Sequence, residues 1–389
     1  MEILFLAHRV PFPPDRGDKI RSFHVLRHLA ARARVHLVAF ADDPRDLTPP
    51  PEFRALLGDC VVVERSKPRW RVGIEALASG RPLSLTAFDD ARVHAAVARI
   101  VHERAIDRIY AFSGQMAQYL PDGVPAVMDF VDADSAKFAA FANDASAVSR
   151  WMYRREARLL GRYERSVTAR VEASLFVSAE EAALVPGARA LENGIDTGFF
   201  DPAARFVPVV GQGRLIVFTG QMNYKPNVDA VISFARDVLP CIRAEHPDVR
   251  FAIVGRAPVG QVRALADEAV IVTGEVPDVR GWLAAAAVVV APLGLARGIQ
   301  NKVLEAMAMA RPVVASPAAA EGIDHAGTIR VADGTAMSGA VSTLLGDEDD
   351  ARALGQAARA RVRARYAWDA CLAPLDAMMG LAEPALVAA

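Results

Sequence analysis

Short runs of apolar residues alternate along the chain with longer segments in which apolar residues recur every three or four positions. The short runs predict buried strands, and the longer segments predict amphipathic helices. In the first half the predicted strands are residues 3–7, 35–40, 60–63, 108–112, 126–130 and 175–177. In the second half they are residues 215–219, 251–254, 270–273, 288–292 and 313–315. The helices predicted between these last strands are residues 227–245, 261–268, 279–285 and 301–310. Such alternation indicates βαβ units and parallel sheets, so the predicted fold class is α/β.

The two halves repeat this scheme, and residues 186–214 between them are rich in Gly and Pro with little periodicity. A chain of 389 residues is too long for one ordinary core and suits two α/β domains. We therefore expect two Rossmann-like domains, residues 1–195 and residues 196–366. Residues 368–381 have a helical pattern, and residues 367–389 also fit a return of the chain to the first domain.

Composition narrows the class of protein. A hydrophobic content of 52% describes a packed globular chain, and a formal net charge of -1 argues against a nucleic-acid partner. The first residues read as a buried strand without the basic leader of a signal peptide, and no apolar run approaches the roughly 18 residues of a membrane span. The three cysteines are isolated and form no Cys-x-x-Cys pair. We expect a cytoplasmic protein without disulfides and without a metal.

The most informative strand exit in the second half is the segment that runs from residue 291 into a predicted helix near Asn301. Asn301 suits the N-cap, Lys302 places a cation in the first turn, and Glu305 lies one turn further on. Ligands bind beyond the carboxyl ends of parallel strands, where amides and helix N-termini favour anions. The spacing fits a diphosphate near Lys302 with a ribose diol near Glu305, and it fits an ordinary capped helix equally well.

A second strand exit carries Gly220 in a turn and Lys225 at the start of the next helix. A lone turn lysine is usually a solvated cation. Two lysines directed at one leaving diphosphate neutralise charge as it develops, so Lys225 and Lys302 are predicted to act together. The chain contains neither Gly-x-Gly-x-x-Gly nor a Walker sequence, which argues against a nicotinamide dehydrogenase or a P-loop kinase.

The first half offers two candidate segments. A proline-rich loop follows the first strand at His8 and contains Gly17, and its cations, among them Arg21, either contact anions or are ordinary surface charges. Asp129 and Asp132 follow a later strand. Either residue faces the cleft and orients an acceptor hydroxyl, or it caps the following helix, which is the hypothesis we favour.

Residues 150–165 alternate arginines with aromatic and apolar side chains. Such a basic amphipathic segment suits contact with anionic lipid at the inner face of a membrane. It also suits a solvated helix with its apolar side in the core, the interpretation we favour.

These sites occur together and in order, and on them the chain resembles a GT-B fold glycosyltransferase of the retaining family 4, the family with glycosyltransferase group 1 domains. The resemblance covers essentially the whole chain. Its motifs are the Gly17 loop and residues 192–196 (ENGID), 220–227 (GQMNYKPN), 254–255 (VG), 273–278 (TGEVPD) and 298–307 (GIQNKVLEAM). Within the family, residues 8–29 and 296–302 look like the sugar transferases of exosortase/PEP-CTERM exopolysaccharide systems.

The resemblance implies two parallel-sheet domains facing a central cleft and transfer of a sugar from a nucleoside-diphosphate-sugar to a saccharide or lipid-linked acceptor. The anomeric configuration would be retained, with no metal and no cofactor besides the donor. It implies that Lys225 and Lys302 bind the diphosphate, that Glu305 binds the ribose, and that the turn ending at Val276 meets the base. The remaining residues that it implies for donor binding are Gly17, Gly220, Arg256, Arg297, Gly298, Ile299, Gln300 and Asn301, and those for the acceptor side are His8, Arg21, Asp129 and Asp132.

Two departures from the family pattern concern the donor sugar. Arg297 stands eight residues before Glu305, where the family has a glutamate that contacts the sugar, and Asp18 replaces the second glycine of the common Gly-Gly loop. Two other functions stay open at this point: a sugar-nucleotide epimerase, which shares the fold, and a non-catalytic sugar-nucleotide-binding protein.

Overall fold

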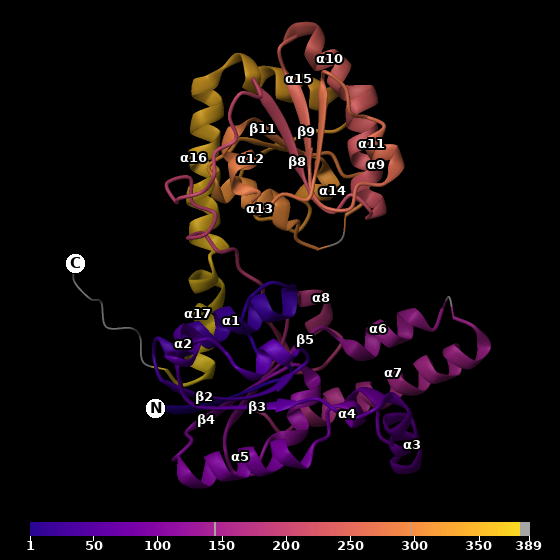
Figure 1. Cartoon of the computed structure of the whole chain (residues 1–389), viewed down its shortest axis with the longest axis vertical. Coiled ribbons are helices and arrows are strands. Elements are labelled where there is room, and N and C mark those ends of the chain that lie inside the picture. Colours follow the sequence, from indigo (N-terminus) through magenta and orange to yellow (C-terminus); the bar gives the residue numbers. More distant parts are fainter. Residues whose placement is uncertain (144, 297, 382–389) are drawn as a thin grey trace, which may run out of the picture. The chain divides into compact units, whose positions relative to one another are not determined.

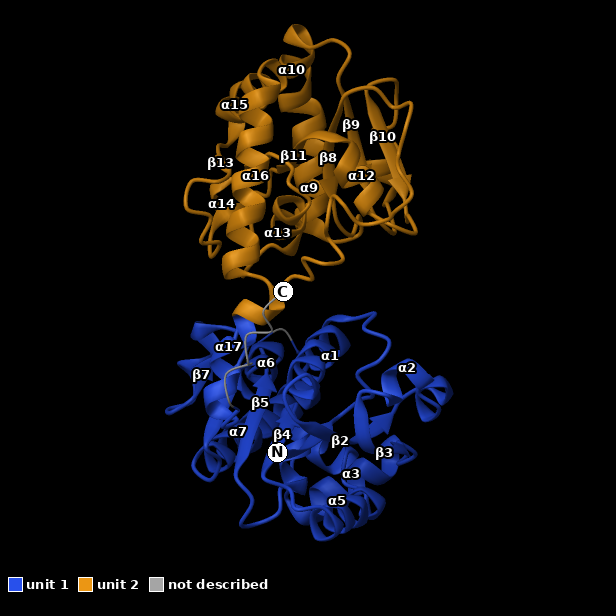
Figure 2. Cartoon of the chain, turned by 90° about the vertical axis from the view of Figure 1, so that its left-hand side faces the viewer, with its two compact units in different colours: residues 1–193, 371–389 blue, residues 194–370 orange. Residues whose placement is uncertain are grey.

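The computed structural model of the chain describes residues 1–143, 145–296 and 298–381, and these form two compact units (Figures 1 and 2). The first unit comprises residues 1–193 together with the segment that begins at Cys371, and the second comprises residues 194–370. The chain returns to the first unit within its last helix, α17 (Trp368–Met378). There the Nε2 atom of His28 lies 2.8 Å from the Asp376 carboxylate, so α17 is tied to the first unit by a polar contact.

The first unit is built on a seven-stranded, fully parallel sheet in the order β3-β2-β1-β4-β5-β6-β7. Its strands are β1 (Glu2–Ala7), β2 (Arg34–Ala41), β3 (Leu57–Glu64), β4 (Arg108–Phe112), β5 (Ala126–Val131), β6 (Ala173–Phe176) and β7 (Arg189–Ala190). Its α-helices before the crossing are α1 (Gly17–Ala30), α2 (Pro51–Arg54), α3 (Arg69–Ser79), α4 (Leu83–Ala87), α5 (Ala91–Glu103), α6 (Asp134–Phe141), α7 (Ala147–Thr168) and α8 (Ala179–Ala182). Two 3-10 helices complete it, η1 (Pro44–Leu47) and η2 (Gly114–Tyr119).

The second unit repeats the scheme with six parallel strands in the order β10-β9-β8-β11-β12-β13. Its strands are β8 (Leu215–Thr219), β9 (Arg250–Val254), β10 (Val270–Gly274), β11 (Ala286–Ala291), β12 (Val313–Ala315) and β13 (Arg330–Val331). Its helices are α9 (Lys225–Ser233), η3 (Phe234–Val238), α10 (Leu239–Glu245), α11 (Gly260–Arg263), α12 (Arg280–Ala285), α13 (Asn301–Ala308), α14 (Pro317–Ala320), α15 (Gly334–Gly346) and α16 (Glu348–Arg365).

The central strands are mostly apolar, as expected where helices cover both faces of a sheet. All five residues of β8 are buried, as are the last five of β1, and each sheet lies within its own cluster of buried apolar side chains. This arrangement of two doubly wound α/β units is the GT-B fold expected from the sequence.

Several predicted boundaries differ from the observed ones. The helix predicted over residues 227–245 is interrupted by η3, a single π turn that precedes Pro240, whose missing N–H leaves a gap in the regular hydrogen-bond ladder. The helix predicted over residues 261–268 ends at Arg263. The two-residue strands β7 and β13 were not expected, since two residues carry no periodicity.

Candidate functional site

A cavity of about 500 Å³ opens in the second unit beyond the carboxyl ends of β8, β9 and β10. The strand order places β8 between β9 and β11. From β8 the chain therefore adds β9 and β10 on one side of the sheet, and then crosses over to add β11, β12 and β13 on the other side. This topological switch point is where open α/β sheets bind their ligands. The cavity is lined by Thr219, Gly220, Gln221, Tyr224, Asn227, Val254, Gly255, Arg256, Glu275, Val276, Val279, Gln300, Lys302 and Glu305.

Lys302 projects into this cavity from the first turn of α13. Its Nζ atom donates a 2.6 Å hydrogen bond to Asn227 Oδ1 and lies 4.4 Å from the centre of the Phe218 ring. Burial lowers the pKa of Lys302 to about 8, although the charge of Glu305 acts in the opposite direction. A helix N-terminus disfavours a cation, so an ammonium held here is suited to a ligand that brings negative charge.

Glu305 lies one turn further along α13, in the wall of the same cavity. Burial raises the pKa of Glu305 to about 7, and the ammonium of Lys302 offsets only part of this shift. A carboxyl group and an ammonium with pKa values shifted toward each other in one cavity are typical of a functional site.

Two glycines allow the backbone to approach the cavity closely. A Cβ atom on Gly255, whose φ is 152°, would lie 1.7 Å from the carbonyl oxygen of Gly220. A Cβ atom on Gly220 would lie 2.8 Å from Asn227 Nδ2 and 3.2 Å from Lys302 Nζ. The turns after β8 and β9 are therefore in contact, and Asn227 and Lys302 lie directly over the first of them.

Six of the residues predicted for the donor site are in the wall of this cavity: Gly220, Arg256, Val276, Gln300, Lys302 and Glu305. Sequence reasoning missed Asn227, which links Lys302 to the turn after β8 because its Nδ2 atom also donates to the Gln221 carbonyl oxygen at 2.9 Å. The sequence did contain a sign of this role, because Asn227 is the last residue of the 220–227 motif. Its expected role, however, was only to begin a helix.

The segment before α13 differs from expectation in one detail. The helix begins at Asn301, so the N-cap position belongs to Gln300, and the prediction of an Asn301 cap was wrong by one residue. Gln300 donates from Nε2 to the carbonyl oxygen of Gly298 at 3.1 Å, and Gly298 has a φ of 62°. In the described part of the chain, Gly298, Ile299 and Asn301 flank the cavity wall without forming it. Arg297 lies outside the described residues.

Lys225 occupies a different environment from Lys302. Its side chain is 84% exposed at the start of α9, and its Nζ atom pairs with Asp229 at 2.8 Å, four residues further along the helix. Among the described residues, the cavity wall includes the neighbouring Tyr224 but not Lys225. The structure thus does not bring the two predicted lysines side by side.

In the first unit, the predicted acceptor residues Arg21 and Asp129 form a buried pair. Arg21 Nε donates to Asp129 Oδ2 at 2.8 Å, and the Tyr110 hydroxyl donates to the same oxygen at 2.6 Å. Burial and the charge of Asp129 raise the pKa of Tyr110 well above its ordinary value, so the hydroxyl keeps its proton. Arg21 also donates to the side chain of Asn193 at 2.9 Å. The pair fixes α1 to β5.

The favoured hypothesis that Asp129 or Asp132 caps the following helix is wrong. The residue before α6 is Ala133, with no side-chain cap, because the chain passes through a positive φ of 71° at Val131 and starts the helix later than expected. Asp132 is exposed, while Asp129 is fully buried.

His8 and Gly17 border the loop between β1 and α1. His8 is buried, its ring stacks on that of Phe112, and its Nε2 atom lies 3.2 Å from the Asp18 carboxylate. Burial lowers the pKa of His8, and Asp18 acts against this shift. Gly17 is the first residue of α1, and a Cβ atom there would meet no other atom within 4 Å, so the fold does not require a glycine at this position.

Within residues 1–143, 145–296 and 298–381, no group of three or more His, Cys, Asp or Glu side chains is placed to hold a metal ion. No helix of the described chain is long and apolar enough to cross a membrane.

Comparisons with known proteins concern the fold and the segment of the chain that contains this cavity. Residues 213–347 match the family model described as glycosyl transferases group 1. Among curated proteins, none matches the chain in sequence. A solved structure of HepE from Anabaena in complex with UDP is 16% identical over 98% of this chain and 100% of its own, with a TM-score of 0.61. Sucrose-phosphate synthase from Thermosynechococcus elongatus is 17% identical over 97% of this chain and 98% of its own, with a TM-score of 0.58.

A third similar structure is WaaG, a glycosyltransferase involved in lipopolysaccharide biosynthesis, which is 16% identical over 97% of this chain and 100% of its own, with a TM-score of 0.60. At these identities the likeness establishes the fold. The family match covers the strands and helices that build the cavity. Residues 213–347 are therefore a group 1 glycosyl transferase domain within a GT-B fold, and the chain is a glycosyltransferase.

Proposed function

We propose that the chain transfers a sugar from a nucleoside-diphosphate-sugar, bound in the cavity of the second unit, to an acceptor hydroxyl. The observation that carries this proposal is the pair formed by Lys302 and Glu305, an ammonium and a carboxyl group in one cavity at the switch point of the sheet. The structures of HepE contain UDP, glucose or UDP-glucose, and this supports a nucleotide-sugar as the donor.

Lys302 is the group we propose for the diphosphate. Its ammonium has one hydrogen bond, to Asn227, and can donate two more to phosphate oxygens. Arg256 lies in the same wall and adds a second positive charge, and Thr219 contributes a buried hydroxyl that has no hydrogen-bond partner among the described residues. A buried hydroxyl without a partner supports a polar ligand at this position.

Glu305 is the group we propose for the ribose. A carboxylate accepts hydrogen bonds from two adjacent hydroxyls, and bound hydroxyls compensate for the water that burial has removed from it. The resemblance assigns the base to the backbone of the turn that ends at Val276, and Val276 lines the same cavity.

In the proposed transfer, the bond from the anomeric carbon to the acceptor oxygen forms while the bond from that carbon to the diphosphate breaks. The departing diphosphate takes the electron pair of the broken bond and the acceptor proton. Lys302 and Arg256 stabilise the negative charge that develops on it. Following the resemblance, we propose that the configuration is retained and that no metal or other cofactor takes part. We further propose a saccharide or lipid-linked acceptor in cytoplasmic exopolysaccharide or glycoconjugate synthesis.

The proposal is tested first by binding. A ligand that binds the native state raises the melting temperature, so UDP-, GDP- and ADP-sugars are screened by thermal shift. We expect one nucleotide class to stabilise the protein, and we expect Lys302→Ala and Glu305→Ala to lose most of that shift. Arg236→Ala is the matched control, because Arg236 is an exposed cation of the same unit outside the cavity. Full binding by folded Lys302→Ala and Glu305→Ala proteins would refute the assignment.

Transfer is then measured with the stabilising donor and a panel of saccharide and lipid-linked acceptors, by chromatography of the products. Donor conversion without any acceptor would instead indicate an epimerase, and saturable binding without turnover would indicate a binding protein. Lys225→Ala is a separate arm of this experiment. Because Lys225 is exposed and paired with Asp229, we expect it to retain more activity than Lys302→Ala.

A further inference from the structure

Exposed apolar side chains gather on α3 and on the hairpin formed by α6 and α7. Two of them are tryptophans, Trp70 with 69% and Trp151 with 59% of the residue exposed. The other two tryptophans of the chain, Trp282 and Trp368, are covered by the second unit's core or buried. We define the docking surface as Trp70, Ile74, Leu77, Phe141, Val148, Trp151 and Met152, all of which are exposed. Large apolar side chains grouped in this way mark a site of interaction.

Helix α3 has apolar side chains on two opposite faces, one packed in the core and one exposed. Val72 and Ala76 form its buried face, while Trp70, Ile74 and Leu77 follow one another at spacings of four and three residues on the other side. These three residues therefore share one exposed face of a helix that is already packed on its opposite face.

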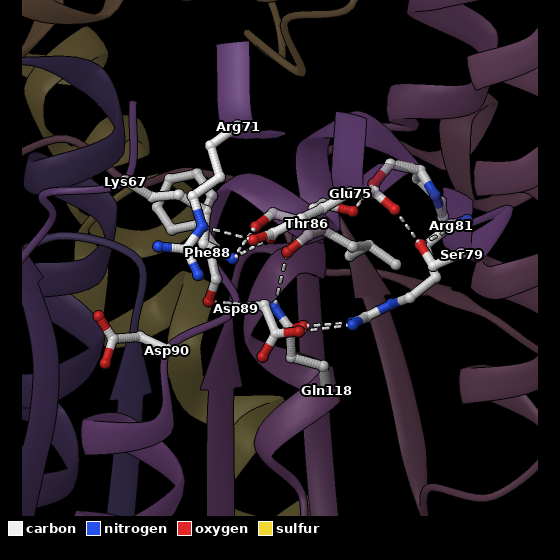
Figure 3. A network of polar contacts seen from close by, with 12 residues as sticks. Lys67, Arg71, Glu75, Ser79, Arg81, Thr86, Phe88, Asp89, Asp90 and Gln118 are labelled. Atoms are coloured by element: carbon white, nitrogen blue, oxygen red, sulfur yellow. Dashed lines mark hydrogen bonds and ion pairs between the residues drawn. The ribbon is translucent and has the colours of Figure 1, made fainter. Parts of the chain in front are cut away.

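A polar network holds α3 in place (Figure 3). The Glu75 carboxylate accepts hydrogen bonds from Lys67 at 2.8 Å and from Arg71 at 2.6 Å, and Lys67 also donates to the carbonyl oxygen of Thr86 at 3.1 Å. Just after α3, Arg81 donates to Asp89 at 2.6 Å. The exposed face thus belongs to a helix anchored at both ends.

The second helix of the hairpin, α7, carries six arginines and two glutamates. Both glutamates are buried: Glu156 accepts from the backbone N–H groups of Leu83 and Ser84, each at 2.9 Å, and Glu164 accepts from Ser135 N at 3.0 Å. Five of the six arginines are exposed. The helix therefore directs its negative charge inward and its positive charge outward.

The favoured sequence hypothesis, that residues 150–165 place their apolar side in the core, is confirmed only in part. That hypothesis holds for Leu160, which is buried, but Trp151 and Met152 are exposed beside the arginines. The inner face instead uses the two glutamates to bind backbone N–H groups of α4 and α6, an interaction that sequence periodicity does not show.

Helices α3 and α7 are in contact. Arg155 of α7 donates from Nη2 to the carbonyl oxygen of Ala76 in α3 at 2.8 Å. A cavity of about 360 Å³ is lined by residues of both helices, including Met152 from α7, and its wall also contains the cations Arg65, Lys67 and Arg69. Figure 1 shows α3, α6 and α7 grouped at one end of the first unit. Met152 of the docking surface and these three cations thus line one cavity.

We propose that the docking surface binds the first unit to an anionic lipid bilayer. Tryptophan and aliphatic side chains enter the boundary between headgroups and acyl chains, and arginines around them pair with anionic headgroups. The chain as a whole has a net charge of -1, so this cluster of cations is local and matches a negative surface. A second copy of the chain fits less well, because it would bring the same exposed arginines against one another. The proposal is independent of the proposed function.

The experiment uses the full-length protein and vesicles of phosphatidylcholine, either alone or with about 30% phosphatidylglycerol, separated by flotation. We expect binding to the anionic vesicles only, release when salt rises to roughly 0.5 M, and a blue shift of tryptophan emission on binding. The Trp70→Ala/Trp151→Ala double variant is expected to lower the partition coefficient roughly tenfold or more. The Arg150→Glu/Arg154→Glu double variant is expected to lower it about thirtyfold or more.

The matched controls lie in the second unit. Val207→Ser/Val210→Ser removes exposed apolar side chains, and Arg236→Glu/Arg263→Glu reverses exposed cations. Neither is expected to change binding. Absence of binding to anionic vesicles, or equal losses in the controls, would overturn the proposal. So would light scattering that shows a dimer abolished by the docking-surface variants, which would assign the surface to a second copy.

A measurement on the native protein does not depend on any variant. Lipids brominated near the headgroup are expected to quench the emission of Trp70 and Trp151, and lack of quenching in vesicle-bound protein would contradict the insertion of this surface. Lys302→Ala is expected to bind vesicles normally, and the docking-surface variants are expected to keep the thermal shift given by the donor. The membrane proposal and the donor proposal can therefore fail separately.

Discussion

Replacing Glu305 by glutamine should stabilise the protein while it removes ribose binding. In the folded state the pKa of Glu305 is about 7, against an ordinary value of 4.5. Between these two pH values the folded state binds more protons than the unfolded state, so the free energy of unfolding falls as the pH rises from 4.5 to 7. The loss is absent below pH 4.5 and complete above pH 7, where it reaches about 3 kcal/mol.

Glutamine carries no charge at any pH and is close in shape to the protonated acid. Glu305→Gln should therefore regain up to about 3 kcal/mol near pH 8, and less than about 1 kcal/mol near pH 5. This gain already takes into account the attraction between the carboxylate and the ammonium of Lys302, because that attraction contributes to the pKa of about 7. For a unit of this size, the change corresponds to a rise in melting temperature of roughly 6–12 °C near pH 8 and about 3 °C or less near pH 5.

The assay is differential scanning calorimetry of the native and Glu305→Gln proteins from pH 5 to pH 8. The unfolding transition of the second unit is identified as the one that UDP-sugar shifts in the native protein. Glu275→Gln is the control, because Glu275 is an exposed carboxylate of the same cavity, and its melting temperature should stay unchanged. A Glu305→Gln protein that melts below the native protein at pH 8 would refute the reasoning. A stability difference that does not grow from pH 5 to pH 8 would do the same.

Three further outcomes are expected. Donor affinity should be highest between about pH 7 and 8, falling in acid as Glu305 gains a proton and in base as Lys302 loses one, which isothermal titration calorimetry measures. Gly220→Ala should lower both stability, by roughly 1–3 kcal/mol, and donor affinity, because its Cβ would clash with the groups above the turn. Arg21→Leu should destabilise the first unit by about 3–5 kcal/mol in calorimetry, because it leaves Asp129 buried without its cation.

Matched substitutions distinguish these effects from general damage. Gly260→Ala should be harmless, since a Cβ atom there meets nothing within 4 Å, and an equal effect at both glycines would contradict the clash. Arg27→Leu removes an exposed arginine of the same helix as Arg21. If it costs as much stability as Arg21→Leu, the buried pair is not the cause. A flat affinity profile from pH 6 to pH 9 would contradict the titration of the two cavity groups.

The longer strands were predictable, because parallel strands covered on both faces appear in the sequence as continuous apolar runs, as in β1 and β8. Helix α3 was not predictable from the sequence. Its apolar residues lie on both its buried and its exposed face, so they do not form the single apolar stripe that identifies an amphipathic helix. Its place in the fold depends on the polar network around Glu75, which joins residues of several elements.

The candidate site was predictable where its residues follow strand ends, as Gly220, Lys302 and Glu305 do. The contact between Lys302 and Asn227 was not, because it joins residues 75 positions apart and depends on two turns meeting at glycines. The same limit explains Arg21 and Asp129, 108 positions apart, whose charges were each visible but whose burial together was not. Sequence separation concealed the partner in both cases.

The return of the chain to the first unit at Cys371 has a consequence for biosynthesis. The contact between His28 and Asp376 joins residues that leave the ribosome 348 positions apart. The whole second unit, residues 194–370, is translated in between, which takes about 10–35 s at roughly 5–20 residues per second. During that time the nascent first unit lacks its closing helix and exposes the apolar surface that α17 later covers. The second unit can fold as one uninterrupted segment, so the unit that is begun first is the one completed last.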